Sequence, residues 1–356
     1  MSNSLKAGVV TGKDYETLVA ACKDGGYALP AVNVVSTSSI NAVMEAAAKN
    51  KSDVIIQLSG GGAEFYAGKG IEDGAKRKLL GAISAARHVH LLAEAYGICA
   101  VLHTDHANRK LLPWIDALIS AGEEEFKQTG RPLYSSHMLD LSEEPLEDNL
   151  AECATFLKRM AAIDMSLEIE LGITGGEEDG VGHDVDEFDN ARLYTQPSEV
   201  LQAYELLSPL GHFTIAAAFG NVHGVYKPGN VKLRPEILKL SQDAVAAAGA
   251  TGDKPLDFVF HGGSGSDPAK IKEALGYGVF KMNIDTDTQF AFATGVGAFV
   301  ADNPEAFKYQ LHPETGAPMK KLYDPRAWLR KGEESMVARL NEAFDVLGAK
   351  GKSLAS

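Results

Sequence analysis

Short apolar runs alternate with helical stretches along most of the chain. Eight of these runs predict strands, and most are solidly apolar rather than alternating, which is typical of strands buried on both faces of a parallel sheet. The predicted strands are Tyr27–Val34, Val54–Leu58, Ile98–His103, Tyr134–Leu139, Ser166–Leu171, Phe213–Phe219, Phe258–His261 and Val279–Ile284. Eight strand–helix repeats favour a closed barrel over a doubly wound sheet.

Helical periodicity fills many of the intervals between these runs. The predicted helices are Ser38–Asn50, Arg77–Tyr96, Leu146–Ile163, Pro197–Leu207, Pro235–Ala248 and Pro268–Leu275. Three of them begin with proline, whose missing N–H costs nothing in a first helical turn. We therefore expect an α/β fold, a (β/α)8 TIM barrel, as a single domain over residues 1–356. The surplus residues should form an N-terminal helix near Lys13–Lys23, long loops near 60–76 and 173–195, and a C-terminal helical extension after residue 300.

Composition narrows the class of protein. The 356 residues are 45% hydrophobic and 23% charged, which is typical of a globular protein and excludes disorder for most of the chain. A net charge of −14 argues against a nucleic-acid partner. No apolar run reaches the roughly 20 residues that span a bilayer, so we expect no membrane partner. Three scattered cysteines and no evident signal peptide favour a cytoplasmic location.

Polar residues follow all eight predicted strands. In a barrel of this kind the active site forms at the carboxyl ends of the strands, so these residues should share one mouth. In strand order they are Asn33, Ser59–Gly62, His103–His106, His137 with Asp140, Glu168 with Glu170, Asn221–Gly224, His261–Gly265 and Asn283–Thr286.

Three histidines, His106, His223 and His261, follow three different strands. Three neutral imidazoles with an open position form a catalytic zinc site, so we interpret these residues as Zn²⁺ ligands. His103 and His137 are left open, because they are either partners of the ligands or ordinary buried residues.

Glycines in the same loops point to phosphate binding. The segment Gly262–Gly265 leads into a helix whose first backbone N–H groups can hold a phosphate, and Asn283–Thr286 opens a second helix beside it. The loops after strands seven and eight are a common phosphate site of barrels. A glycine-rich turn alone is weak support for phosphate binding. The position of this turn directly after the seventh strand strengthens that interpretation.

Two sets of carboxylates are candidates for acid–base chemistry. Asp105 adjoins His106, so we do not expect its side chain to point the same way, but it can face a bound substrate. Glu177 and Glu178 lie in a glycine-flanked loop that can close over the mouth as a lid. A solvated acidic loop is the simpler interpretation of Glu178.

Several strings in this constellation resemble the class II, zinc-dependent fructose-bisphosphate aldolases, in particular their longer-chain branch of enteric bacteria and fungi. The strings are HTDH at 103–106, SSHMLD at 135–140, LEIELGITGGEE at 167–178, AAAFGN at 216–221, HGGSG at 261–265 and YDPR at 323–326. The resemblance extends from about Thr11 to about Leu347. It implies reversible cleavage of fructose 1,6-bisphosphate to dihydroxyacetone phosphate and glyceraldehyde 3-phosphate, a step of glycolysis and gluconeogenesis.

The resemblance also implies a role for each matching position. It makes His106, His223 and His261 the zinc ligands, and Asp140 and Glu170 the holders of a second or displaced divalent metal. Asp105 would be the acid, Glu178 the base, and Asn283 would stabilise developing charge. The implied substrate contacts are Asn33, Ser59, Gly224, Lys227, Gly262, Gly263, Ser264, Asn283, Ile284, Asp285, Thr286 and Arg326. It further implies a monovalent cation, K⁺ or Na⁺, near Gly224 and Gly262, and a homodimer in which Arg326 reaches the neighbouring site.

Three alternatives stay open. A Schiff-base aldolase would need a strand-end lysine, and Lys281 is the candidate. A non-catalytic binding protein on the same fold would not need the intact Asp105 and Glu178. A tagatose-bisphosphate aldolase would differ only in stereochemistry at one substrate carbon. The sequence also departs from relatives at Ala107–Asn108, in the acidic loop 181–189 and before Lys320, where the subunit contact can differ.

Overall fold

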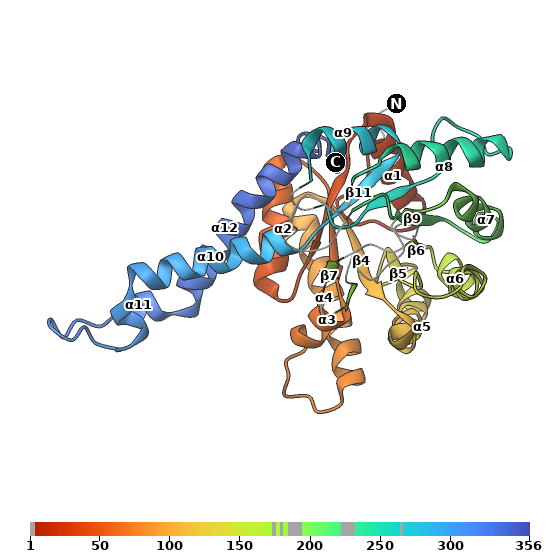
Figure 1. Cartoon of the computed structure of the whole chain (residues 1–356). Coiled ribbons are helices and arrows are strands. Elements are labelled where there is room, and N and C mark those ends of the chain that lie inside the picture. Colours follow the sequence, from red (N-terminus) through yellow and green to blue (C-terminus); the bar gives the residue numbers. More distant parts are fainter. Residues whose placement is uncertain (1–3, 173–175, 179–180, 184–193, 222–231, 264–265) are drawn as a thin grey trace.

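A computed structural model describes residues 4–172, 176–178, 181–183, 194–221, 232–263 and 266–356. Eight parallel strands close into a barrel (Figure 1). They are β2 (Leu29–Asn33), β3 (Val54–Leu58), β4 (Cys99–Ala107), β5 (Ser136–Leu139), β6 (Ser166–Leu171), β9 (Phe213–Ala217), β10 (Phe258–Phe260) and β11 (Val279–Ile284). The pairing runs β4-β3-β2-β11-β10-β9-β6-β5 and closes through β4 and β5. All eight predicted strands are thus confirmed, with ends that differ by a few residues.

A ninth strand, β1 (Gly8–Val9), was not predicted. It pairs in parallel with Cys99 and Ala100 at the start of β4, whereas β5 pairs with the later part of β4 from His103 onward. The chain ends return to this region, because the Leu5 N–H donates to the Leu354 carbonyl and the Leu354 N–H donates to Asp53. The described N-terminal segment, from residue 4 onward, and the C-terminus therefore lie together against the barrel (Figure 1).

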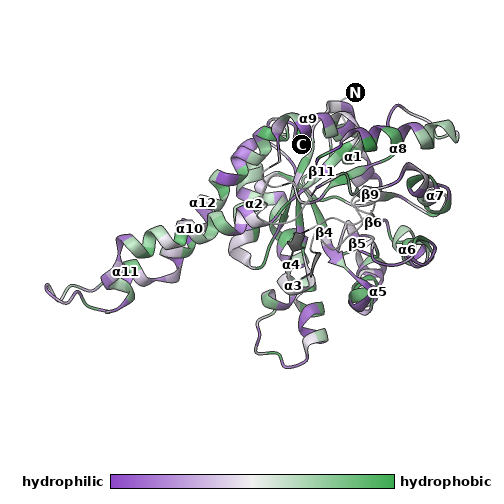
Figure 2. Cartoon of the chain, in the orientation of Figure 1, coloured by the Kyte–Doolittle hydropathy of each residue, from purple (hydrophilic) through white to green (hydrophobic). Residues whose placement is uncertain are grey.

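Helices surround the barrel and cover its outer face. They are α1 (Gly12–Gly25), α2 (Thr37–Asn50), α3 (Gly60–Tyr66), α4 (Gly74–Tyr96), α5 (Leu112–Thr129), α6 (Leu146–Ala161), α7 (Pro197–Leu207), α8 (Glu236–Ala247) and α9 (Pro268–Gly276). Apolar residues line the strands and the inward faces of the helices (Figure 2). Phe258, Phe260 and Phe280 are each fully buried, as expected for strands covered on both faces.

Helices α3 and α5 were not predicted from the sequence and correct its interpretation. Residues 60–76 are not one long loop, because α3 occupies Gly60–Tyr66 and α4 already begins at Gly74. The Ser59 hydroxyl caps α3 by accepting from the Gly62 N–H at 3.0 Å, so a cap and close packing hold a glycine-rich segment helical. Helix α5 was not predicted, although Trp114, Leu118 and Gly122 recur at helical spacing on its buried face.

The predicted C-terminal extension forms an arm that projects from the barrel (Figure 1). Its elements are α10 (Thr286–Asp302), the short helix η2 (Pro304–Phe307), α11 (Lys320–Tyr323) and α12 (Pro325–Val346). Helix α12 packs along α10 and then against α2, where Arg330 bonds to both oxygens of Glu45. The backbones come close at Gly295, where a Cβ would lie 2.3 Å from the Lys331 carbonyl oxygen.

Among the described residues, no helix has the length and apolar content that a membrane crossing requires. The remaining two strands, β7 (Gly176–Glu178) and β8 (Val181–His183), form an antiparallel hairpin within the predicted lid segment.

Candidate active site

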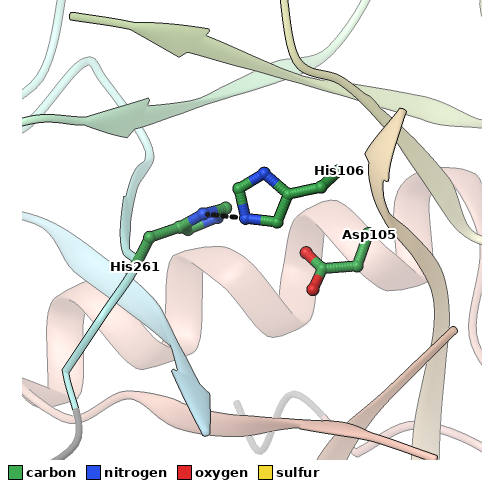
Figure 3. Close-up of side chains that lie close together, drawn as sticks. All are labelled: Asp105, His106 and His261. Carbon is green, nitrogen blue, oxygen red and sulfur yellow. Dashed lines mark hydrogen bonds between the residues drawn. The ribbon is translucent and has the colours of Figure 1, made fainter. Parts of the chain in front are cut away.

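Two predicted zinc ligands meet at the mouth of the barrel. His106 lies near the end of β4 and His261 directly follows β10. The His106 Nε2 and the His261 Nδ1 are 3.0 Å apart. One oxygen of Asp105 joins them, and the three ligand atoms lie within 4.8 Å of one another. Figure 3 shows the three side chains gathered around one space. The site therefore combines two imidazoles and a carboxylate from separate parts of the chain.

Asp105 and His106 point toward the same space, which corrects the expectation that neighbouring residues would diverge. Side chains alternate along a regular strand, so adjacent residues normally face opposite ways. Here the pairing of β4 with β5 shifts register between Thr104 and Ala107, and His106 has a φ of 44°. This left-handed backbone is uncommon for a residue other than glycine, and such strain clusters at functional sites.

The second ring nitrogen of His106 faces a separate acidic group. Its Nδ1 lies 3.0 Å from Asp140 Oδ2 and 3.6 Å from Glu170 Oε2. Burial would raise the pKa of Asp140, but its hydrogen bonds with His106 and Ser142 hold that pKa below the usual range. His106, Asp140 and Glu170 bring ligand atoms close enough to hold a metal ion, so His106 lies between two candidate sites.

The other ring nitrogen of His261 is also held. The His261 Nε2 lies 2.9 Å from Glu168 Oε1, and Lys281 donates to both oxygens of that carboxylate. Burial lowers the pKa of His261 below its ordinary value, which favours the neutral imidazole that metals bind. In both His106 and His261, one ring nitrogen faces the cluster and the other lies within hydrogen-bond distance of a carboxylate. This arrangement is common among metal-binding histidines.

These residues fit a zinc ion by the chemistry of their donors. Neutral imidazoles oriented by carboxylates, with space left for substrate, are the ligands of catalytic zinc sites. The expected third ligand, His223, lies outside the described residues, together with Gly224, Lys227 and Ser264. For Glu178, the described part of the chain gives only a position in β7, opposite Val181 of β8.

Asp105 is fully buried and is held by three side-chain amides. Asn33 and Gln57 each donate to Oδ2 at 3.0 Å, and Asn283 donates to Oδ1 at 3.2 Å. Gln57 also donates to the Asn33 oxygen at 2.6 Å, so the amides form a connected network. Gln57 was missed by sequence reasoning. The signal was available, since it is the single polar residue within the apolar run Val54–Leu58.

His103 and His137, left open by the sequence, are both fully buried. The His103 Nδ1 lies 2.7 Å from the Ser136 hydroxyl, and its Nε2 lies 3.5 Å from Glu168 Oε2. His137 bonds to the Thr104 hydroxyl and packs against the Tyr134 ring. Burial lowers the pKa of His137 to about 3. His103 therefore borders the residues behind His261, whereas His137 has ordinary core contacts.

Several of the predicted substrate contacts lie in the described part of the mouth. Asn33 lines a cavity of about 390 Å³ together with Ser36, Gly61, Gly62 and Thr288, so the start of α3 and the start of α10 border one space. Asn283 and Ile284 end β11, Asp285 and Thr286 begin α10, and Gly262 follows His261 with a φ of 60°. Gly263 packs on Met282, whose Cε would lie 2.4 Å from an added Cβ. A cavity of about 490 Å³ lies elsewhere, lined by Gly12, Asp164, His212 and Asp257.

Arg326 does not join this constellation within the chain. It lies in the first turn of α12, its side chain is 90% exposed, and it pairs with Asp324. Helix α11, which directly precedes it, lies on the projecting arm away from the barrel (Figure 1).

Comparison with known proteins agrees with this geometry. The family described as "Fructose-bisphosphate aldolase class-II" matches residues 13–352. The chain is 57% identical to a fructose-bisphosphate aldolase of Haemophilus influenzae, covering 96% of each protein, and 54% identical to a fructose-bisphosphate aldolase class 2 of Escherichia coli, covering 97% of each. The crystal structure of fructose-bisphosphate aldolase from Campylobacter jejuni matches with a TM-score of 0.89 at 55% identity over 99% of both chains. With family, sequence and fold in agreement over nearly its whole length, the chain belongs to the class II fructose-bisphosphate aldolases.

Proposed function

We propose that this chain catalyses the reversible, zinc-dependent aldol cleavage of fructose 1,6-bisphosphate into dihydroxyacetone phosphate and glyceraldehyde 3-phosphate. The observation that carries this proposal is the pair His106 and His261 beside an amide-held Asp105 at the mouth of the barrel. Family membership and relatives of the same name support it. The reaction places the chain among aldehyde-lyases of glycolysis and gluconeogenesis, and we assign it to the cytoplasm as one domain.

The reaction requires an acid, a base and a group that stabilises a carbanion. Bound to His106, His223 and His261, zinc would supply Lewis-acid polarisation of the ketone. Asp105 gives a proton to the aldehyde oxygen during condensation and removes it during cleavage, and its amide network fixes the direction of its oxygens. Glu178 exchanges the proton on the triose carbon, and Asn283 stabilises developing charge beside Asp105.

The remaining predicted positions complete the site. Asp140 and Glu170 hold a second or displaced divalent metal, and a K⁺ or Na⁺ ion binds near Gly224 and Gly262. The residues that contact the substrate are the predicted ones: Asn33, Ser59, Gly224, Lys227, Gly262, Gly263, Ser264, Asn283, Ile284, Asp285, Thr286 and Arg326.

Three variants test the assigned roles. Asp105→Ala should retain proton exchange on dihydroxyacetone phosphate while losing cleavage, and an equal fall in both would remove Asp105 from the acid role. Glu178→Ala should lose exchange and keep zinc, so normal exchange would argue for the solvated-loop interpretation. His106→Ala should lose zinc, and full zinc occupancy by elemental analysis would contradict its assignment as a ligand.

A homodimer in which Arg326 serves the neighbouring site is part of the proposal. Helix α10 has no charged residue between Asp287 and Asp302, and Phe290 on it is 70% exposed, as expected of an arm that another subunit covers. Mixed dimers of His106→Ala and Arg326→Ala subunits would contain one complete site out of two. Because random mixing makes about half of the dimers mixed, co-refolded variants should regain about a quarter of wild-type activity. No regained activity in confirmed mixed dimers would refute the shared site.

The two enzymatic alternatives have direct tests. Inhibition by a chelator, without trapping of substrate by borohydride, excludes Schiff-base chemistry at Lys281, whose Nζ is bonded to Glu168. Comparing kcat/KM for fructose and tagatose 1,6-bisphosphates decides the stereochemical preference, and we expect the fructose substrate to be favoured.

A further inference from the structure

A buried ion pair lies behind the candidate metal site. Lys281 on β11 donates to both oxygens of Glu168 on β6, at 2.9 and 2.7 Å, and both side chains are 1% exposed. Strands β10 and β9 separate β11 from β6 in the sheet, so the pair crosses the barrel interior. Removing two charges from water costs free energy that a buried pair often fails to recover. A role beyond stability is therefore the better explanation of this pair.

The same carboxylate orients His261. Glu168 Oε1 lies 2.9 Å from the His261 Nε2, while the His261 Nδ1 lies 3.0 Å from His106. A carboxylate paired with lysine is an acceptor only, so the His261 Nε2 must carry a proton and donate it. The lone pair of the neutral ring then resides on Nδ1, the nitrogen that faces the metal cluster.

We propose that Glu168 and Lys281 are positioning residues of the metal centre: Lys281 fixes the Glu168 carboxylate, and Glu168 fixes the tautomer and ring orientation of His261. The proposal rests on the proposed zinc site, because it concerns the residues behind one of its ligands. It also gives a role to a lysine buried within β11, whose amine is bonded to Glu168 inside the barrel.

The experiment measures zinc affinity in purified full-length protein by competition with a chromophoric chelator. Glu168→Gln keeps the shape of the side chain, but its amide no longer fixes the His261 tautomer. We expect zinc affinity to fall about 10–100-fold, the usual effect of removing such a partner. In Co²⁺-loaded protein the visible absorption bands should shift, because they report ligand geometry and not stability.

Lys281→Met should weaken zinc binding in the same direction by releasing the carboxylate. Because a single change leaves one buried charge without its partner, it can prevent folding. The double variant Glu168→Gln/Lys281→Met avoids that charge and decides the question if a single variant does not fold. It should show the same loss of zinc affinity and the same spectral shift.

Lys23→Met provides the matched control. Lys23 pairs with Asp257 in another mostly buried ion pair, and neither residue belongs to the metal groups. Its loss should lower thermal stability and leave zinc affinity and the Co²⁺ spectrum unchanged. Unaltered affinity and spectrum in folded Glu168→Gln and in the double variant would overturn the proposal. Failure of the wild-type protein to bind zinc would instead overturn the proposed function.

Discussion

Helix α3 is held against α4 at a contact that leaves no room for a methyl group, and this contact gives a quantitative prediction. A Cβ added to Gly81 would lie 1.8 Å from the Ala63 carbonyl oxygen, whereas real Cβ contacts are essentially never below 3.0 Å. Gly81→Ala must therefore push the two helices apart by about 1.2 Å. Overpacking of this kind costs about 1–3 kcal/mol, and replacing glycine within a helix returns about 0.5–1 kcal/mol.

The difference between these ranges is a loss of up to about 2.5 kcal/mol in the free energy of unfolding, and we expect the upper half of that range because the contact is so short; urea denaturation measures it. A functional effect should accompany it, because Ser59 caps α3 and is a proposed phosphate contact. Displacement of a positioning group by about 1 Å can lower catalysis by about 100-fold, so kcat/KM for fructose 1,6-bisphosphate should fall about 10–100-fold. Zinc content should be unchanged, since neither candidate ligand lies on α3 or α4.

Gly74→Ala is the matched control, because Gly74 lies in the same helix and an added Cβ would lie 3.7 Å from the flexible end of the Arg77 side chain, an ordinary contact distance. It should leave the free energy of unfolding unchanged or raised by up to about 1 kcal/mol, and kcat/KM within about twofold of the wild-type value. If the free energy of unfolding and kcat/KM of Gly81→Ala equal those of this control, then α3 does not pack on α4 as described. Such a result would also contradict the expectation that displacing Ser59 weakens catalysis.

Three further changes test other parts of the structure. Gln57→Leu removes a hydrogen bond to the Asp105 carboxylate, and bonds to charged groups contribute about 1.5–3 kcal/mol. We therefore expect kcat to fall about 10–100-fold while the zinc content stays unchanged. A kcat within twofold of the wild-type value would contradict a role of the amide network in catalysis. Hydrogen bonding to Arg330 lowers the pKa of Glu45 to about 2, so this pair stabilises the folded state above pH 4.5 and its contribution is lost as the pH falls toward 2. The loss of stability in acid should therefore be shallower in Glu45→Gln than in the wild-type protein. Equal acid unfolding curves for the two proteins would disprove this expectation. Removing metal with a chelator should lower Tm, and added zinc should restore it, because a metal that binds only the folded site stabilises the folded state. Calorimetry without such a shift would argue against a structured metal site.

The barrel itself was predictable because its strands are buried on both faces. Eight apolar runs, most of them followed by a helix, can bury both faces of a parallel sheet in few ways other than a closed barrel. Because the polar residues follow the strands, closure of the barrel then brings Asp105, His106 and His261 to one mouth. The helix α3 was not predictable from local composition, since its three consecutive glycines disfavour a helix. Tertiary contacts decide that segment, as the close approach of Gly81 to Ala63 shows.

Details of the site depend on contacts that no local pattern contains. Gln57 and Asn283 lie far apart in sequence, and only closure of the barrel brings both amides to Asp105. Lys281 could be recognised as a strand-end lysine, but its partner on β6 could not be identified from spacing. The convergence of Asp105 with His106 depends on one irregular step in β4, which reverses the simple rule of alternation.

The charge at the mouth connects metal binding to substrate binding. Four carboxylates, Asp105, Asp140, Glu168 and Glu170, gather in the described part of the mouth, where Lys281 pairs with Glu168 and His106 lies against Asp140 and Glu170. A bisphosphate adds roughly three to four further negative charges at neutral pH. These carboxylates would repel such a substrate, so we expect compensating positive charge from a bound metal, from helix N-termini and from the proposed substrate contacts Lys227 and Arg326. With the proposed zinc site and the proposed role of Arg326 in the neighbouring subunit, substrate affinity should depend on metal loading and on dimer formation, and the net charge of −14 of the whole chain does not decide it.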